Sequence, residues 1–419
     1  MRRYDSYKDS GVEWLGDVPS HWELKRLKQL FVEKKHKQNL SLNCGAISFG
    51  KVIEKDDDKV TEATKRSYQE VLKGEFLINP LNLNYDLISL RIALSEIDVV
   101  VSAGYIVLKA KQIINKKYFS YLLHRYDVAY MKLLGSGVRQ TINYGHISDS
   151  ILVAPPLSEQ QKIAQFLDDK TAKIDQAVDL AEKQIALLKE HKQILIQNAV
   201  TRGLNPDVPL KNSGVEWIGQ VPEHWGIKKI KYLTKIYRGK FGHRPRNDPA
   251  LYGGIYPFVQ TGDVARANKY ITNYTQTLNK KGIKVSQLFP QGALVMAIAA
   301  NIGDVAILDF EAYAPDSIVG FTPNKEISLK FLYYCFITLA EELKRSAIQN
   351  TQANLNIERI GSIRSVYPNI EEQCQITNYL DIQIGKIDQT IELKTAHIEK
   401  LKEYKSVLIN DVVTGKVQV

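Results

Sequence analysis

Four Gly-Lys pairs are the places where this sequence could bind a nucleoside triphosphate. In a phosphate-binding loop, the lysine is followed by serine or threonine, because that hydroxyl group binds the Mg²⁺ ion. Here the pairs are followed instead by Val52, Phe241, Ile387 and Val417. The sequence therefore contains no readable nucleoside-triphosphatase site.

Two proline-containing segments and one acidic cluster could serve methyl transfer or nucleic-acid cleavage. Enzymes that methylate the amino groups of bases hold the amine with an acidic or amide residue, two prolines and an aromatic residue. The segment Ala154–Leu157 (APPL) lacks both outer residues, and Asn79–Asn82 (NPLN) lacks the second proline. A nuclease site could combine Asp316 with Glu342 and Lys344, but the local sequence EELK is typical of a solvated helix. We therefore predict a binding protein with no catalytic residues and no cofactor of its own.

The cysteines and histidines do not form a metal site. Cys44, Cys335 and Cys374 are too few and too scattered for a disulfide framework or a zinc site, which favours a reduced, cytosolic compartment. The eight histidines show no metal-binding spacing, and His21 and His224 belong to a repeat described below. We predict that the protein binds no metal.

Excess positive charge points to a polyanionic partner. The formal net charge is +10 and the sequence pI is about 9.1, which favours nucleic acid over a membrane surface. No apolar run approaches the roughly 18–20 residues of a membrane span. The N-terminal residues MRRYDSYKDSGVEW lack the apolar region of a signal peptide. We expect a soluble cytoplasmic protein without a membrane partner.

Loops that mix Arg, Lys, Gln and Asn are the best candidates for contacts with DNA, because Arg pairs well with guanine and Asn or Gln with adenine. These loops are Lys34–Asn39, Asn82–Asp86 and Gly137–Tyr144 in the first half, and Tyr237–Asn247, Gln260–Asp263 and Gln349–Asn356 in the second. The candidate DNA-binding residues are Lys34, Lys35, Lys37, Gln38, Asn82, Asn84, Arg139, Gln140, Tyr144, Arg238, Lys240, Arg244, Arg246, Gln260, Thr261, Gln349, Asn350 and Gln352. For each of them the alternative is a solvated loop residue, and lysine more often contacts the backbone than a base. The cluster Arg238, Lys240, Arg244 and Arg246 is the best suited to phosphate.

The segments that must position these loops are written twice. Trp14 and Trp22 lie in SGVEWLGDVPSHW, and Trp217 and Trp225 lie in SGVEWIGQVPEHW, so one short repeat holds all four tryptophans of the 419-residue chain. Between Lys8–Leu30 and Lys211–Leu233, 14 of 23 positions are identical. A second repeat follows in each half, where PPLSEQQKIAQFLDDKTAKIDQ aligns with PNIEEQCQITNYLDIQIGKIDQ. The chain therefore consists of two homologous halves.

The middle of each half differs between the two copies. The regions Phe31–Ile113 and Thr234–Glu326 share almost no sequence, although both are rich in short β-type runs broken by Gly, Asn and Pro. One interpretation is a constant scaffold that carries two different reading domains. The alternative is a gene duplication followed by drift.

Each half ends in a predicted long helix of up to 44 residues, or about 65 Å at 1.5 Å per residue. Ser158 with Gln161, and Asn369 with Glu372, are spaced as capping boxes at the starts of the helices. Gly203 and Gly415 mark their ends.

Apolar residues in both helices follow a coiled-coil spacing, in which the separations alternate between three and four residues. The predicted seam, which could also serve subunit docking, is Ile174, Val178, Ile185, Leu188, Leu195, Ile387, Ile391, Ile398, Leu401 and Leu408. Because so narrow a stripe needs another helix of equal length, we expect the two helices to pair with each other. Antiparallel pairing is favoured over parallel pairing, because it places one domain at each end and needs only a short linker. Lysines such as Lys192 in the seam are mildly unfavourable to tight pairing.

The sequence thus predicts an α+β fold with two homologous α/β domains and two long antiparallel coiled-coil helices, related by a pseudo-twofold axis. The predicted boundaries are 1–157 and 204–368 for the domains, and 158–203 and 369–419 for the helices. In this arrangement the tryptophan segment of each half lies beside the end of the other half's helix. Its indoles either anchor the domain to the helix pair or are ordinary core residues of two homologous domains.

The arrangement resembles the specificity subunit of type I restriction–modification systems over essentially the whole chain. The resemblance rests on the GVEWLGDVPSHW and GVEWIGQVPEHW segments, on PPLSEQQKIAQFLD and PNIEEQCQITNYLD, and on the paired heptad helices. The segments PFVQTGDV and FPQGALVMAIAANIGDVAIL are similar to the target-recognition domains of that family.

The resemblance implies that each domain reads one half of an interrupted, asymmetric target in double-stranded DNA. It also implies that the helices dock two adenine methyltransferase subunits, to which restriction and translocase subunits add. S-adenosylmethionine, ATP and Mg²⁺ would then be bound by these partner subunits. Two readers on one side of B-DNA predict half-sites about one helical turn, or roughly 10–10.5 base pairs, apart. The alternatives are a coiled-coil adaptor protein and a stand-alone DNA-binding regulator.

Overall fold

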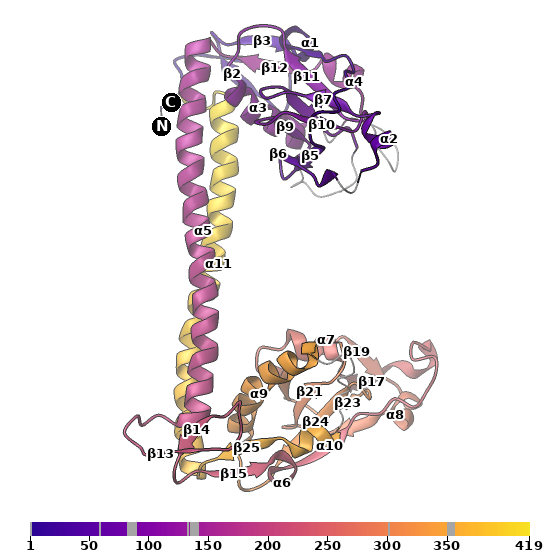
Figure 1. Ribbon diagram of the computed structural model, residues 1–419, viewed down its shortest axis with the longest axis vertical. Helices are drawn as coiled ribbons and strands as arrows, with labels where there is room; N and C mark the ends of the chain where they lie inside the picture. The colour runs from indigo at the N-terminus through magenta and orange to yellow at the C-terminus, as the bar shows by residue number, and fades with distance from the viewer. Residues whose placement is uncertain are drawn as a thin grey trace. The chain divides into compact units, whose positions relative to one another are not determined.

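Two long helices run through the chain and connect its two halves. Helix α5 spans Leu157–Arg202 and helix α11 spans Ile370–Val413. The computed structural model describes residues 2–57, 60–81, 90–131, 134, 142–300, 302–349 and 357–419, with the backbone alone for 341–349. Unit 1 comprises Met1–Ala181 with Thr395–Val419, and unit 2 comprises Glu182–Lys394. Each unit contains an α/β domain and one half of each long helix (Figure 1).

The long helices pair in antiparallel orientation. In unit 2, Lys394 Nζ donates to Gln184 Oε1 at 2.6 Å, and Lys192 Nζ donates to Asp388 Oδ1 at 2.7 Å. The residue number rises along α5 while it falls along α11, so the chains run in opposite directions. In unit 1, Lys405 Nζ donates to Asp175 Oδ1 at 2.6 Å. The predicted antiparallel pairing is confirmed, and the seam lysines fit it because each one reaches a polar or acidic side chain on the facing helix.

The predicted seam faces the inside of this helix pair. Its members are buried (Ile174, Ile387, Ile398 and Leu408) or half-buried (Val178, Ile185, Leu188, Leu195, Ile391 and Leu401). These side chains therefore pack between the two helices and do not form an outer surface.

The ends of the helices follow the predicted capping chemistry in three of four places. Asn369 caps α11, since Glu372 N donates to Asn369 Oδ1 at 2.9 Å and Asn369 Nδ2 donates to Glu372 Oε2 at 3.0 Å. The prediction that Ser158 caps α5 is wrong, because this helix already begins at Leu157. Pro156 occupies the capping position, and its carbonyl oxygen accepts from the backbone N–H of Glu159 at 2.9 Å. Gly203 and Gly415 follow the helix ends with φ of +76° and +75°, as a C-terminal cap requires.

Unit 1 is built on a four-stranded sheet of order β4-β11-β8-β9, in which every pairing is antiparallel. Smaller pairs, β1-β2, β3-β12, β5-β6 and β7-β10, surround it. The strands are β1 Tyr7–Asp9, β2 Asp17–Pro19, β3 Glu23–Arg26, β4 Phe31–Glu33, β5 Gly45–Ser48, β6 Lys51–Glu54, β7 Gln69–Val71, β8 Phe76–Ile78, β9 Ile92–Leu94, β10 Val99–Val101, β11 Ile106–Ala110 and β12 Ile151–Ala154. The shorter helices are α1 Leu27–Leu30, α2 Glu62–Lys65, α3 Lys116–Ala129 and α4 Tyr144–Ser148.

Unit 2 contains a five-stranded sheet of order β16-β24-β21-β22-β18 and a four-stranded sheet of order β19-β17-β23-β20. The pairs β13-β14 and β15-β25 complete it. The strands are β13 Leu210–Asn212, β14 Gln220–Pro222, β15 Gly226–Lys229, β16 Thr234–Arg238, β17 Tyr252–Phe258, β18 Tyr270–Ile271, β19 Gln276–Leu278, β20 Gln287–Phe289, β21 Leu294–Ala297, β22 Val305–Leu308, β23 Ala312–Ala314, β24 Ile318–Pro323 and β25 Arg364–Tyr367. The shorter helices are α6 Ile230–Leu233, α7 Thr261–Arg266, α8 Gly282–Val285, α9 Leu329–Gln349 and α10 Ile357–Ser362, with a 3₁₀ turn at Pro249–Leu251.

The variable regions of the two halves each contain a sheet with the same order of four strands. The order β4-β11-β8-β9 in unit 1 corresponds to β16-β24-β21-β22 in unit 2, and α3 and α9 follow the sheet in equivalent places. Gly74 and Gly292 precede equivalent strands with φ of +85° and +76°. The backbone N–H of Gly74 donates to the carbonyl oxygen of Ser95, just after β9, and that of Gly292 donates to the carbonyl oxygen of Leu308, the last residue of β22. The two middles therefore differ in their loops and additions while they keep a common frame.

Each domain core is completed by both long helices. In unit 1 the core includes Ile163 and Leu167 of α5 with Val412 and Val413 of α11. In unit 2 the core includes Ile196, Ala199 and Val200 of α5 with Ile376, Leu380 and Ile384 of α11. The predicted fold class, two homologous α/β domains with a pair of antiparallel helices, is confirmed. Within the described part of the chain, none of the helices is long and apolar enough to span a membrane.

Candidate nucleic-acid interface

A pocket in unit 2 brings together three of the predicted DNA-binding residues. Arg246, Gln260 and Thr261 line a cavity of about 450 Å³. The other lining residues are Phe241, Asn247, Tyr252, Phe258, Gln276, Ala299, Ala300, Pro315 and Ser317. Arginine and carboxamide groups thus meet beside the aromatic ring of Tyr252, a combination that suits base edges and phosphate.

Hydrogen bonds hold the polar groups of this pocket in place. The amide nitrogen of Gln260 donates to Oε1 of Gln276, so the two carboxamides form one connected pair. Arg246 Nη2 forms an ion pair of 2.7 Å with Asp316 Oδ2, and the hydroxyl of Tyr252 donates to the Arg246 carbonyl oxygen. The side chain of Arg246 is still about half exposed. It can therefore contact a ligand without leaving its carboxylate partner.

The neighbouring basic residues differ in how firmly they are held. Arg244 Nη1 donates to the carbonyl oxygens of Phe241 and His243, both at 2.8 Å, although its side chain is exposed. Arg238 Nε donates to the carbonyl oxygen of Asp316 at 2.9 Å. Lys240, two residues after the end of β16, is exposed as well. These residues form one basic surface next to the pocket.

In unit 1 the segment Lys34–Asn39 wraps around the buried carboxylate of Glu70. Lys34 Nζ contacts Glu70 at 3.2 Å and Glu75 at 2.7 Å, and only 14% of its side chain is exposed. Hydrogen bonds from Asn39 and the lysines lower the pKa of Glu70 in spite of its burial. The ammonium group of Lys34 is therefore occupied by these two carboxylates and is poorly placed for a contact with DNA.

The other predicted residues of this segment are more accessible. Lys37 pairs with Glu70 at 3.3 Å but keeps 66% of its side chain exposed, and Lys35 is exposed. Gln38 is exposed and donates to the carbonyl oxygen of Arg66 at 2.9 Å. Tyr144 is half-buried, and its hydroxyl donates to the Phe31 carbonyl oxygen at 3.0 Å, so it is tied to the sheet.

Several predicted residues lie outside the described part of the structure. These are Asn82, Asn84, Arg139, Gln140, Asn350 and Gln352, together with the side chain of Gln349.

The structure also identifies a loop that the sequence analysis did not include among the candidates for DNA contact. The β8–β9 connection, which holds Asn82 and Asn84, corresponds in the shared sheet to the β21–β22 connection. Ala299 and Ala300 of the latter line the unit 2 pocket, and Ala300 has a φ of +60°. The two connections share no sequence, so only the glycines that precede the strands, Gly74 and Gly292, could have signalled their equivalence.

A second missed residue is Phe49, at the tip of the β5–β6 hairpin in unit 1. Its side chain is 92% exposed, and its φ of +47° is unfavourable for a bulky residue. Gly50 beside it faces Leu90 so closely that a Cβ atom would come within 2.7 Å of Leu90 Cδ1. The hairpin tip therefore lies next to the chain just before β9. Its signal in the sequence is an aromatic residue before glycine in the alternating run GAISFGKVIE.

The repeated tryptophan segments join each domain to both long helices. Trp22 Nε1 donates to Glu159 Oε2 at 3.0 Å, and Trp225 Nε1 donates to Glu372 Oε1 at 3.3 Å. Both glutamates lie in the first turn of a long helix, α5 or α11. Trp22 and Trp225 are also fully buried in the domain cores. The two interpretations of the tryptophans, anchors and core residues, are therefore both correct for this pair.

Trp22 and Trp225 also face the end of the helix that belongs to the other half. A Cβ atom on Gly415 would lie 2.9 Å from Trp22 Cζ3, and one on Gly203 would lie 3.2 Å from Trp225 Cζ2.

Among the described residues, no group of three or more His, Cys, Asp or Glu side chains could hold a metal ion. Taken together, the fold and the pocket define a protein with two related recognition domains on one helical scaffold.

The family described as "Type I restriction modification DNA specificity domain" matches residues 19–189 and 222–403. The chain belongs to this family, and its two matches correspond to its two homologous halves. The resemblance noted from the sequence is therefore confirmed. Specificity subunits are the non-catalytic, DNA-recognition subunits of type I restriction–modification systems.

Relatives named as specificity subunits of type I restriction enzymes match most of the chain. A protein of Methanocaldococcus jannaschii assigned as the MjaX specificity subunit of a type I restriction enzyme is 25% identical over 97% of this chain and 96% of its own length. The MjaVIII specificity subunit of the same organism is 26% identical over 63% of this chain and 61% of its own length.

Two solved structures share the fold. A chain from a study of complex assembly and conformational transition of the type I restriction–modification system superposes with a TM-score of 0.74, at 14% identity, over 96% of this chain and 99% of that chain. The HsdS subunit from Thermoanaerobacter tengcongensis gives a TM-score of 0.56, at 15% identity, over 98% of this chain and 100% of that chain.

Proposed function

We propose that this specificity subunit reads a bipartite, asymmetric target in double-stranded DNA, with a spacer of fixed length between the half-sites. The observation that carries the proposal is the unit 2 pocket, in which Arg246 converges with Gln260 and Thr261 from two separate segments of a DNA specificity domain. Arg246 would contact phosphate or guanine, and the Gln260–Gln276 pair would contact a base edge.

The two half-sites should differ, because the two domains share a sheet but not the residues at its loops. In unit 1 the exposed candidates are Lys35, Lys37 and Gln38, and Phe49 is exposed at the tip of the β5–β6 hairpin. An exposed aromatic residue with a strained backbone suits stacking on, or insertion beside, a base step. The candidates outside the described residues, among them Asn84 and Arg139, remain part of this proposal.

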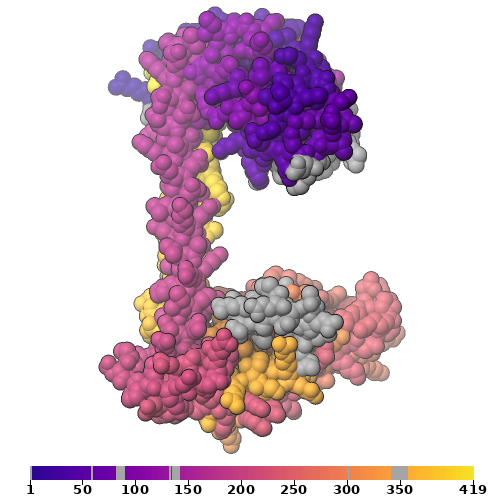
Figure 2. All heavy atoms as spheres, in the orientation of Figure 1, coloured from indigo at the N-terminus to yellow at the C-terminus, as the bar shows by residue number. Residues whose placement is uncertain are grey.

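We further propose that methyltransferase subunits dock on the outer faces of the long helices, and that restriction subunits join them. Helix α5 exposes Leu180, Leu187 and Ile194 by 58%, 63% and 49%, at intervals of seven residues. Helix α11 exposes Ile382, Leu393 and Tyr404 by 58%, 65% and 50%, at intervals of eleven residues. Figure 2 shows the near face of α5 open to solvent in its middle part. Rows of exposed apolar side chains of this kind favour packing against another protein.

The seam residues from Ile174 to Leu408 would support this docking indirectly, because they hold the helix pair together. S-adenosylmethionine, ATP and Mg²⁺ would be bound by the partner subunits, and the complex would work in the cytoplasm.

The test is to select duplexes from a random DNA library with the purified full-length chain and to map methylated adenines in cells with and without the gene. The proposal expects one motif with two unlike halves and a constant gap, found by both methods. A contiguous motif, or no motif in either experiment, would contradict it. Selection at two salt concentrations separates specific reading from general attraction to phosphate.

A further inference from the structure

A tyrosine–aspartate contact between domain and long helix occurs in both units. In unit 1, Tyr121 of α3 donates to Asp168 Oδ1 of α5 at 2.7 Å, and its hydroxyl lies 3.2 Å from Thr171 Oγ1. In unit 2, Tyr334 of α9 donates to Asp381 Oδ1 of α11. Tyr334 and Asp381 each lie 213 residues after their counterparts, which is the offset of the second sequence repeat. The contact therefore belongs to the duplicated scaffold and has been kept in both copies.

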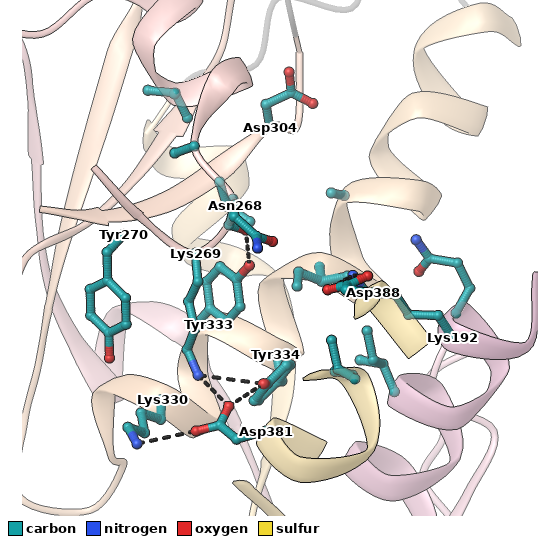
Figure 3. A pocket seen from close by; sticks show the side chains of 18 of the residues that line it. Lys192, Asn268, Lys269, Tyr270, Asp304, Lys330, Tyr333, Tyr334, Asp381 and Asp388 are labelled. Carbon is teal, nitrogen blue, oxygen red and sulfur yellow. Dashed lines mark hydrogen bonds and ion pairs between the residues drawn. The ribbon is translucent and has the colours of Figure 1, made fainter. Parts of the chain in front are cut away.

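In unit 2, two lysine side chains also donate hydrogen bonds to the aspartate of this contact. Lys269 Nζ donates to Asp381 Oδ1 at 2.5 Å, and Lys330 Nζ donates to Asp381 Oδ2 at 3.1 Å (Figure 3). The Lys269 ammonium also lies 4.7 Å from the ring centre of Tyr334 and 5.4 Å from that of Tyr333. In unit 1 the position of Lys330 is taken by Lys117, which pairs instead with Glu96 of its own domain at 2.6 Å.

A cavity of about 450 Å³ next to this contact separates parts of the unit 2 domain from the long helices. The domain lines it with Asn268, Lys269 and Tyr333, and the helices line it with Lys192 and Asp388 (Figure 3). Apolar packing between domain and helices is interrupted at this place. The directional hydrogen bonds to Asp381 must therefore restrain the domain where close packing does not.

We propose that Tyr121–Asp168 and Tyr334–Asp381 are equivalent joints, which set the angle of each recognition domain on the helix pair and thereby the spacer length that the protein accepts. The proposal rests on the bipartite reading described above. Each tyrosine lies on a helix packed against the sheet of its domain, so a rotation at the joint moves the whole sheet and its loops. The tyrosines and aspartates are positioning residues and need not contact DNA.

Tyrosines elsewhere in the two domains supply matched controls. The hydroxyl of Tyr237 lies 3.0 Å from Thr322 Oγ1, within the unit 2 domain. The hydroxyl of Tyr126 lies 2.8 Å from Ser150 Oγ, within the unit 1 domain. Tyr237→Phe and Tyr126→Phe therefore remove a tyrosine hydrogen bond inside a domain without touching a joint.

The experiment measures binding of the full-length chain to duplexes that carry its selected target with the native spacer, or with a spacer one base pair longer or shorter. The readout is the ratio of affinities for native and altered spacers. We expect Tyr121→Phe to lower this ratio roughly 10-fold, as loss of one hydrogen bond to a charged group allows. Tyr334→Phe should lower this ratio less than Tyr121→Phe does, because the two lysines still hold Asp381. Asp381→Asn should lower the ratio more than Tyr334→Phe.

Affinity for the native spacer, and the ratios of the two control variants, should stay within about twofold of the unmodified protein. A lower unfolding temperature with an unchanged ratio in the joint variants would overturn the proposal, because a merely stabilising contact affects all duplexes equally. An equal loss of ratio in the controls would overturn it as well. If the unmodified chain selects no bipartite target, the proposed function itself fails, and this result is distinct from either outcome.

Discussion

Gly415 lies against the indole of Trp22 so closely that a Cβ atom on the glycine would come within 2.9 Å of Cζ3. The same glycine has a φ of +75°, which side chains rarely adopt. Gly415→Ala should therefore destabilise unit 1 by about 1–3 kcal/mol, through strain and the displaced indole. Thermal unfolding of the full chain, followed by tryptophan fluorescence, measures the shift.

Gly385→Ala is the matched control, because Gly385 is interior to α11 and a Cβ atom there would meet nothing within 4 Å. This variant should gain about 0.5–1 kcal/mol of stability from higher helix propensity. Equal destabilisation by both substitutions would show that the contact between Gly415 and Trp22 is not the cause.

The contribution of Asp381 to stability should depend on pH. Burial raises the pKa of this carboxyl group, but hydrogen bonds from Lys269, Tyr334 and Lys330 outweigh it and leave the pKa below its ordinary value. A carboxylate with a lower pKa in the folded state stabilises the fold above its unfolded-state pKa of about 3.9, and this stabilisation is lost as pH falls through the folded-state pKa. The difference in unfolding temperature between the unmodified protein and Asp381→Asn should be largest near pH 7 and should shrink below about pH 4. A difference that stays constant down to pH 3 would contradict this account.

Changing Arg244 and Arg246 together to alanine should weaken binding to DNA that carries the second half-site. Both side chains are exposed on the basic surface beside the unit 2 pocket. If both contact phosphate, the slope of log affinity against log salt should fall by up to about 2. Affinity is measured at two salt concentrations, with Lys183→Ala on the exposed face of α5 as the control. Unchanged affinity at both concentrations would remove the two arginines from the interface.

Inserting one heptad into both long helices should change the spacer that is accepted. Seven helical residues add about 10.5 Å, close to the length of three base pairs. The inserted protein should prefer a longer spacer or lose recognition. Binding to a series of duplexes with different spacers is the measurement, and a retained preference for the original spacer would show that the helices do not set it.

Leu187→Glu and Leu393→Glu should abolish co-purification of a methyltransferase subunit while DNA binding is kept. Both side chains are more than 60% exposed, so the charge disturbs an outer surface and not the fold. Leu195→Glu in the half-buried seam is the contrasting variant, because it should separate the helices and lower stability by several kcal/mol. Undiminished co-purification with both surface variants would place the docking site elsewhere.

The constant parts of the chain could be predicted from sequence because their signals are local and occur twice. The heptad spacing predicts the helix pair, and Asn369 with Glu372 predicts the start of α11. The same reasoning failed for Ser158, because the proline pair before it lets the helix begin at Leu157. Two residues within three positions, Pro156 and Ser158, could precede the first turn of this helix. Only the backbone of the folded protein shows that Pro156 does.

The reading surfaces were less predictable because they depend on contacts between distant segments. Lys34 has the composition of a DNA contact, but Glu70 and Glu75, which occupy its ammonium group, lie 36 and 41 residues away. Gln276 carries no motif and enters the pocket only because β19 pairs with β17. Loop composition identifies candidate residues, whereas the sheet register decides which of them share a surface.

Val412 and Val413, near the end of the chain, are fully buried in the core of the first domain. During translation, this domain leaves the ribosome long before the residues that complete its core have been made. At about 5–20 residues per second, its apolar surface stays uncovered for at least ten seconds. A chain that stops before α11 would therefore lose its first reading domain as well as its last helix.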